Sequence, residues 1–144
     1  MTVVLDTSLL IASINVDEPR HPEAQLLLRR ILAGELGVPV TSDYVLDEGL
    51  TLLRRRPGRK EVSQDYASFF LGEADSPPPI SLRTATRQEI EKAARLHFQH
   101  YERGLSFTDC ILVVLAQDLG ATVASFDEGF DGIVPRVPAK KGQA

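Results

Sequence analysis

The chain has 144 residues, 43% hydrophobic and 25% charged, with a net charge of −4, which fits one globular domain over residues 1–144 and argues against a disordered or uniformly basic protein. No apolar run approaches the roughly 18 residues of a membrane helix, and no basic leader precedes the first apolar stretch. From the apolar pattern we expect no membrane partner. Because Cys110 is the single cysteine, we expect no internal disulfide and a cytoplasmic protein.

Strand and helix patterns alternate in the first half of the chain. Apolar residues at 2–6 predict a strand buried on both faces, and a loop that includes His21 follows the first helix. Thr41 or Ser42 is the expected N-cap of the third helix. In chain order the predicted elements are a strand over 2–6, helices over 8–15 and 23–36, a strand over 36–42, and a helical hairpin over 43–56 and 60–74.

The alternation continues in the second half, after a proline-rich connection. In chain order we expect a strand over 80–84, an amphipathic helix over 86–102, a nearly all-apolar helix over 106–121, a strand over 121–127, and a short edge strand over 132–137. Residues 136–144 are expected to form a frayed tail. Strands separated by helices imply right-handed crossovers, so the sequence predicts an α/β fold with a mainly parallel sheet and helices on both faces.

Four acidic residues occupy related places in this pattern. Asp6 and Asp127 each follow a strand, and Asp109 lies in the first turn of the apolar helix. Glu48 lies near the start of a helix that follows another strand, beside an apolar stripe. Sites in parallel sheets form outside the carboxyl ends of the strands, so these side chains are predicted to converge.

Crowded carboxylates repel one another and become protonated unless a cation lies between them. Hard divalent ions such as Mg²⁺ prefer oxygen ligands and bind through a few carboxylates and waters. A metal ion shared by Asp6, Glu48, Asp109 and Asp127 would therefore explain why carboxylates stand at the ends of buried elements. Such a site can act on a phosphodiester by generating a nucleophilic water and neutralising charge.

Each acid also has a purely structural interpretation. Ser106 and Asp109 fit a capping box, Asp127 can start a turn, and Asp6 can cap the short helix that follows it. On the third helix, Glu48 can be solvated while Asp43 or Asp47 faces inward. Four such coincidences at one sheet edge are the less economical explanation, although each remains open when taken alone.

Four stretches carry a resemblance to a known family: VVLDTSLLIA, TSDYVLDEGLTLL, LSFTDCILVVLAQDLGA and ATVASFDEGF. They resemble the PIN-domain ribonucleases, especially VapC-type toxins of toxin–antitoxin pairs, and the resemblance covers residues 2–137. It implies a PIN-like three-layer sandwich with four or five strands and a Mg²⁺- or Mn²⁺-dependent endoribonuclease that cleaves RNA. It also implies a homodimer and a cognate antitoxin that covers or enters the site.

The resemblance assigns roles to individual residues. Asp6, Asp109 and Asp127 would hold the metal directly or through water, and Glu48 would orient or deprotonate the attacking water. The supporting hydroxyls would be Thr7 or Ser8 after the first acid and Thr108 before the third. The family often carries one more acid shortly after the position of Asp127. In this chain it corresponds to Glu128 or Asp131, and the sequence does not decide between them.

A cluster of basic residues is the candidate for holding RNA phosphates. Its members are Arg54, Arg55, Arg56, Arg59 and Lys60. The alternative is that these side chains only complement the dipole at the end of a helix.

Other function classes fit the motifs less well. A haloacid-dehalogenase-like phosphatase needs a second aspartate two residues after the first, where this chain has Ser8. A receiver domain needs an adjacent acidic pair after its first strand, which is missing here. The alternative from another class is a non-catalytic PIN-fold scaffold that binds RNA or protein.

Overall fold

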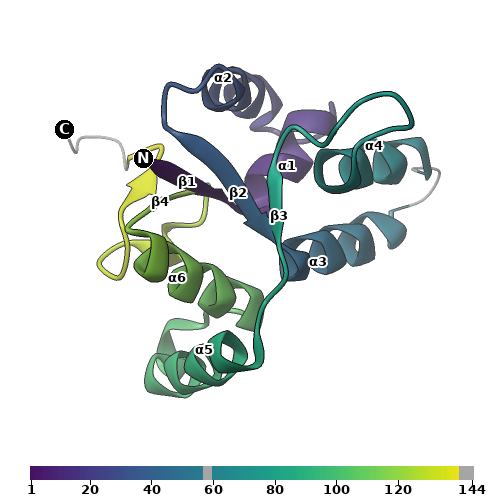
Figure 1. Ribbon diagram of the computed structural model, residues 1–144. Helices are drawn as coiled ribbons and strands as arrows, with labels where there is room; N and C mark the ends of the chain where they lie inside the picture. Colours follow the sequence, from purple (N-terminus) through teal and green to yellow (C-terminus); the bar gives the residue numbers. More distant parts are fainter. Residues whose placement is uncertain (57–59, 140–144) are drawn as a thin grey trace.

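The computed structural model describes residues 1–56 and 60–139, which form a three-layer α/β sandwich (Figure 1). Its central sheet has five strands in the order β3-β2-β1-β4-β5, and every neighbouring pair is parallel. The strands are β1 (Thr2–Leu5), β2 (Val38–Ser42), β3 (Ser81–Arg83), β4 (Thr122–Ala124) and β5 (Arg136–Val137). This confirms the predicted mainly parallel sheet.

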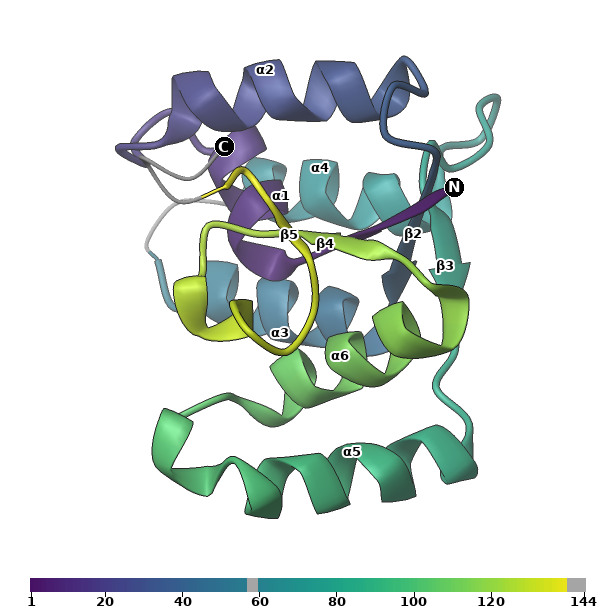
Figure 2. The same cartoon turned by 90° about the vertical axis from the view of Figure 1, so that its left-hand side faces the viewer.

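Helices cover both faces of the sheet. Figure 2 shows α2, α1 and α4 above the strands and α6 and α5 below them, with α3 close to both α4 and α6. The helices are α1 (Thr7–Ile14), α2 (His21–Leu32), α3 (Asp43–Arg54), α4 (Lys60–Leu71), α5 (Arg87–Gln99) and α6 (Phe107–Leu119). Within residues 1–56 and 60–139, no helix is long and apolar enough to cross a membrane.

The strand order places a reversal point at the centre of the sheet. From β1 the chain proceeds outward through β2 and β3, and it then returns to the other side of β1 to form β4 and β5. β1 therefore pairs with both β2 and β4. Open α/β sheets bind ligands outside the carboxyl ends of the strands at such a point, because the connections diverge and leave a crevice.

The burial pattern explains the element types. Val3, Val4 and Leu5 are completely buried, as expected for the central strand of a sheet covered on both faces. In α6 a continuous run from Thr108 to Ala116 is buried, which accounts for its almost entirely apolar sequence. Gly120 takes a left-handed conformation with φ of 61° and ends this helix.

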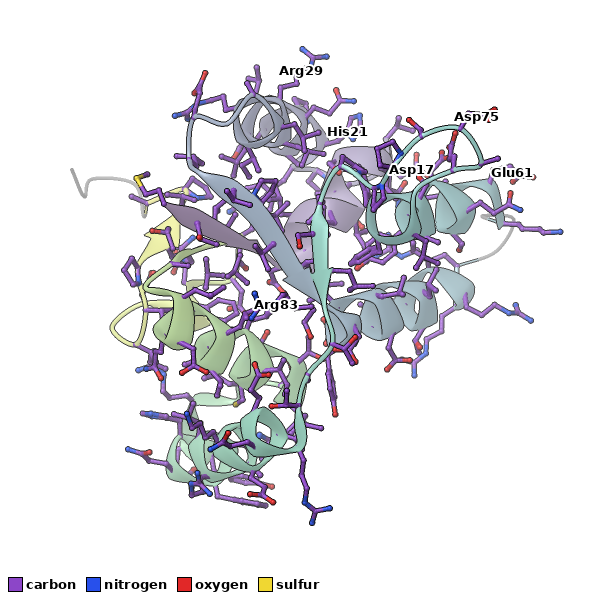
Figure 3. All side chains as sticks on the ribbon, in the orientation of Figure 1. Asp17, His21, Arg29, Glu61, Asp75 and Arg83 are labelled. Carbon is purple, nitrogen blue, oxygen red and sulfur yellow. The ribbon has the colours of Figure 1, made fainter. Side chains whose placement is uncertain are left out.

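Two expectations about the chain need correction. His21, expected in a loop, is the first residue of α2, and its Nδ1 donates to the carbonyl of Ala12 at 2.7 Å. Figure 3 labels His21 between α2 and α1. Arg136 and Val137 fall in both the predicted edge strand and the predicted frayed tail; they form β5 at the sheet edge and pair with Val123 and Ala124, so the strand prediction is right for these two residues and the tail prediction is wrong for them.

A close approach between α3 and α4 fixes the position of α3. A Cβ at Gly49 would lie 2.0–2.3 Å from atoms of the Tyr66 ring, so the ring occupies the space that a side chain would need. The Tyr66 hydroxyl donates to the carbonyl of Val45 at 2.6 Å. Gly49 is therefore required by tertiary packing, and the contact sets the orientation of the neighbouring Glu48.

Candidate active site

A cleft of about 590 Å³ lies beyond the carboxyl ends of β1 and β4, and all four predicted acids line it. Its walls come from the loop between α1 and α2, the start of α1, the inner side of α3, the start of α6 and the segment after β4. The lining residues are Asp6, Thr7, Ser8, Ile11, Ala12, Glu18, Pro19, Arg20, Glu48, Leu52, Arg56, Ser106, Asp109, Phe126 and Asp127.

Asp6 is the most deeply buried of the four acids, with 3% of its surface exposed. One carboxylate oxygen, Oδ1, accepts from the backbone N–H of Thr7 at 2.7 Å, so Asp6 is the N-cap of α1. The other, Oδ2, accepts from Ser125 Oγ at 2.6 Å and from Ser8 Oγ at 3.2 Å. These donors compensate part of the cost of burying the carboxylate.

Asp109 has the capping role that its sequence motif suggested. Its backbone N–H donates to Ser106 Oγ at 3.1 Å, and its Oδ2 accepts from the backbone N–H of Ser106 at 2.9 Å. The residue is 8% exposed and faces the cleft. No hydrogen bond to Oδ1 is formed within residues 1–56 and 60–139. The capping box and the cleft position are therefore compatible.

Asp127 combines a turn and a cleft position in the same way. Its Oδ1 accepts from the backbone N–H of Gly129 at 2.8 Å and caps a short 3-10 helix, Glu128–Phe130. Its own backbone N–H donates to Ser125 Oγ at 2.9 Å. Ser125 Oγ thus bridges Asp6 and Asp127 (it donates to the first and accepts from the second).

Ser125 is a residue that the sequence reasoning missed. Its side chain is completely buried at the end of β4 and contacts two of the four acids. The available signal was a serine directly after the apolar strand residues and two positions before Asp127, a place where a buried hydroxyl needs polar partners.

Of the three acids on α3 that were candidates to face inward, the structure brings Glu48 to the cleft. Asp47 is exposed, and Asp43 Oδ1 accepts from the backbone N–H of Ala85 at 3.0 Å, away from the site. Glu48 is half-buried, and within the described part of the chain it forms no hydrogen bond or ion pair. Its carboxylate is the least committed of the four.

Burial and mutual repulsion raise the pKa values of two acids. The pKa of Asp6 rises from 3.8 to about 7, chiefly through burial; the hydrogen bonds from Ser125 and Thr7 lower it, and the charges of Asp109 and Glu48 raise it further. The pKa of Asp109 rises from 3.8 to about 6, again mainly through burial, with contributions from Asp127 and Glu48. Such shifts in a cleft are typical of functional sites.

The predicted hydroxyls differ in position. Thr7 and Ser8 line the cleft, and Thr7 Oγ1 is buried with no hydrogen-bond partner among the described residues. Ser8 Oγ accepts from the backbone N–H of Phe126 at 3.3 Å besides donating to Asp6. Thr108 is buried in α6 and does not line the cleft.

The predicted basic cluster is divided by the structure. Arg56 lines the cleft and forms a close hydrogen-bonded ion pair with Glu18. Arg54 and Arg55 line a separate hollow beside Ser63, and Lys60 is exposed at the start of α4. Arg59 lies outside the described residues. Arg20, which the sequence reasoning did not single out, is the second basic residue of the cleft.

The donor set suits a hard divalent cation. All four acids offer oxygen, and the unpartnered Thr7 hydroxyl lies beside Asp6. Within residues 1–56 and 60–139, no three His, Cys, Asp or Glu side chains gather closely enough to enclose a metal by themselves. Mg²⁺ commonly keeps several waters and needs only one or two carboxylates, so the residues fit a partly hydrated ion.

The two later acids do not join the cleft. Arg136 donates to both carboxylate oxygens of Asp131, at 2.8 and 3.0 Å. Glu128 lines a neighbouring hollow of about 510 Å³ instead. The site is therefore built from the four acids predicted first.

Comparison with known proteins identifies relatives that cover most of the chain. A sequence model of the PIN domain matches residues 3–134. The chain is 27% identical over 132 residues to a VapC ribonuclease of Archaeoglobus fulgidus, a match that covers 90% of this chain and 80% of that protein.

Two solved structures are similar in fold. VapC20 of Mycobacterium tuberculosis, described as a sarcin-ricin loop cleaving toxin, aligns with a TM-score of 0.73 and 28% identity over 87% of this chain and 89% of that one. VapBC2 of Rickettsia felis, solved with a DNA fragment from its promoter, aligns with a TM-score of 0.65 over 94% of this chain and 97% of that one. At 16% identity the second match shows the shared fold alone.

Proposed function

The chain belongs to the PIN-domain family and is a homologue of VapC ribonucleases, and we propose from this premise that it is a divalent-metal-dependent endoribonuclease, the toxin of a type II toxin–antitoxin pair. The observation that carries the proposal is the convergence of Asp6, Glu48, Asp109 and Asp127 on one cleft. Three of these acids use part of their hydrogen-bonding capacity in local caps and still face the same space.

In this proposal the four acids have two different roles. Asp6, Asp109 and Asp127 would hold a Mg²⁺ or Mn²⁺ ion, which would neutralise charge at the phosphate and lower the pKa of a bound water. Glu48, which has no competing partner in the described part of the chain, orients the attacking water and accepts its proton. Ser125 and Ser8 fix the Asp6 carboxylate through Oδ2.

The substrate class we propose is single-stranded or looped RNA, encountered in the cytoplasm. VapC20, at 28% identity, is described as cleaving the sarcin-ricin loop, so a ribosomal stem-loop belongs among the first RNAs to test. The sequence-derived basic cluster contributes through Arg56 at the cleft, whereas Arg54 and Arg55 face another hollow.

We further propose an antitoxin as the natural partner and a homodimer as the working assembly. Apolar side chains from several elements contribute to the lining of the cleft, and such a lining suits an inserted partner segment with a basic group directed at the acids. These apolar lining residues are Ile11, Ala12, Pro19, Leu52 and Phe126.

The test is cleavage of end-labelled stem-loop and unstructured RNAs by wild type, Asp6→Asn, Asp109→Asn and the control Asp47→Asn. We expect Mn²⁺- or Mg²⁺-dependent cleavage that EDTA abolishes, a loss of at least about 100-fold in both site variants, and unchanged activity in the control, whose side chain is exposed on α3. Circular dichroism establishes that each variant is folded. Cleavage by Asp6→Asn at the wild-type rate would refute the assignment of the acids.

A non-catalytic scaffold is the second candidate, because the capping bonds of Asp6, Asp109 and Asp127 would be needed in any case to stabilise the fold. The same RNAs distinguish the two functions. Saturable RNA binding with no metal-dependent cleavage, equal in wild type and Asp109→Asn, would favour the scaffold.

A further inference from the structure

The two basic residues of the cleft are engaged in different ways. Arg56 is neutralised by its close contact with Glu18. The Arg20 guanidinium instead lies over the ring of Phe126, with Cζ 4.9 Å from the ring centroid, and its ion pair with Glu23 is long, at 3.9 Å, and exposed. Stacking on a ring fixes the guanidinium plane and leaves the N–H donors at its edge available.

Arg20 is presented by a segment that is hydrogen-bonded along its length. The side chain of Asn15, which is buried, accepts from the backbone N–H of Asp17 at 3.2 Å. The backbone N–H of Glu18 donates to the carbonyl of Asn15, and that of His21 donates to the carbonyl of Glu18, each at 3.0 Å. A group held in this way loses less conformational entropy on binding than one on a free surface side chain.

Arg20 and Phe126 also stand where two hollows meet. Both residues line the acidic cleft, and both line the neighbouring hollow of about 510 Å³. The other guanidinium of that hollow, on Arg136, is committed to Asp131 and to the carbonyls of Ser125 and Pro138. An extended chain leaving the acids on this side therefore passes Arg20 first.

We propose that Arg20, oriented by Phe126, is a positioning residue that binds a non-scissile phosphate of the RNA backbone beside the linkage that is cut; this rests on the proposed ribonuclease function. The four carboxylates repel phosphates, so the substrate needs a cation at the rim of the cleft. The planar guanidinium can contact two phosphate oxygens at once. Because Phe126 directly precedes Asp127, the phosphate bound by Arg20 has a fixed position relative to the acids.

The experiment compares wild type, Arg20→Ala, Arg20→Lys and the control Arg29→Ala, whose side chain lies on the outer side of α2 (Figure 3). The substrate is an oligonucleotide that wild type cleaves. It is prepared unmodified and as a set of versions, each with one neutral methylphosphonate at a different linkage flanking the scissile bond. We expect Arg20→Ala to raise KM about tenfold or more with kcat changed less than about threefold, and Arg20→Lys to restore part of the loss. Arg29→Ala is expected to match wild type.

The modified substrates identify the phosphate. One methylphosphonate should raise KM for wild type and have no additional effect on Arg20→Ala, because the contact is already lost. Equal effects of every methylphosphonate on both proteins, or an unchanged KM in Arg20→Ala, would overturn the inference.

The two proposals can fail separately. If wild type cleaves no RNA, the proposed ribonuclease function fails, and binding of a stem-loop RNA that carries one methylphosphonate, placed in turn at each linkage of the loop, is then measured for the same proteins. A methylphosphonate-sensitive loss of binding confined to Arg20→Ala would still support the phosphate contact. No difference in binding between Arg20→Ala and wild type would refute it.

Discussion

At the scale of single residues, each cleft aspartate serves the fold and the site together. Asp6 caps α1 through Oδ1, and Asp109 completes a capping box through Oδ2. Capping satisfies the free N–H groups of a helix start, and the same helix start stabilises a negative charge. The structural and functional interpretations of these acids are therefore not alternatives, because a helix N-terminus at the sheet edge is a favourable place to hold a carboxylate.

The raised pKa of Asp6 leads to a prediction about stability and pH. With a pKa of 3.8 rising to about 7 on folding, the folded state binds the extra proton between these values, so this carboxyl makes the protein less stable as pH rises from about 4 to about 7. In EDTA at pH 8, Asp6→Asn should raise the free energy of unfolding by about 1–3 kcal/mol. Near pH 4 the gain should vanish.

The measurement is urea denaturation of wild type and Asp6→Asn in EDTA at several pH values between 4 and 8. Asp47→Asn is the control, since its side chain is exposed and its effect should not vary with pH. A variant less stable than wild type at pH 8 would contradict the prediction and indicate that the hydrogen bonds to Asp6 outweigh its burial.

At the scale of elements, the contact between α3 and α4 determines where Glu48 lies. Helix propensity by itself favours alanine over glycine in the interior of α3 by roughly 0.5–1 kcal/mol. The Tyr66 ring reverses this preference, because it fills the space next to Gly49. Local preference and tertiary packing therefore predict effects of opposite sign for one substitution.

We predict that Gly49→Ala destabilises the protein by about 2–3 kcal/mol, because an added Cβ meets the Tyr66 ring and separates α3 from α4. The same displacement should lower RNA cleavage by moving Glu48. Thermal and urea denaturation check the first effect, and initial cleavage rates the second. The control is Thr51→Ala on the exposed side of α3, which should be neutral or slightly stabilising.

At the scale of the whole molecule, an aromatic patch remains uncovered at the end of α5. Phe98 and Tyr101 are 71% and 62% exposed, and their rings stack with 6.4 Å between centroids. His97 contacts both rings and Phe107, which begins α6 next to the cleft. Exposed aromatic groups of this kind mark interaction surfaces, and the proposed homodimer is the partner that we expect to cover this one.

The corresponding prediction is that Phe98→Glu converts a dimer into a monomer without loss of folding. A charged residue at an exposed position changes the stability of the monomer little, so folding is retained. The same charge buried in an interface between two copies destabilises the dimer. Light scattering coupled to size exclusion measures the mass. Leu71→Glu, which alters another exposed apolar residue at the end of α4, should leave the dimer intact. A monomeric wild type would refute the proposed assembly.

Asp6, Asp109, Asp127 and most elements were predictable from the sequence because their signals are local. The apolar run before Asp6 predicts a central strand, and the spacing from Ser106 to Asp109 predicts a helix start. Element ends were less accurate. The strand expected over 121–127 contains three residues, Thr122–Ala124, because the backbone N–H groups of Phe126 and Asp127 donate to the side chains of Ser8 and Ser125 instead of to a neighbouring strand.

The sequence by itself determined the order of strands and helices, the capping box at Ser106 and the positions of Asp6, Asp109 and Asp127 at strand ends and a helix start, because hydrophobic period and capping are encoded within a few neighbouring residues. Only the tertiary structure decided that Glu48 rather than Asp47 faces the cleft, that Arg56 is separated from Arg54 and Arg55, and that Ser125 and Arg20 belong to the site. These facts depend on how far each helix is rotated against its neighbours. That rotation is set by contacts between residues distant in the chain, which no local pattern records.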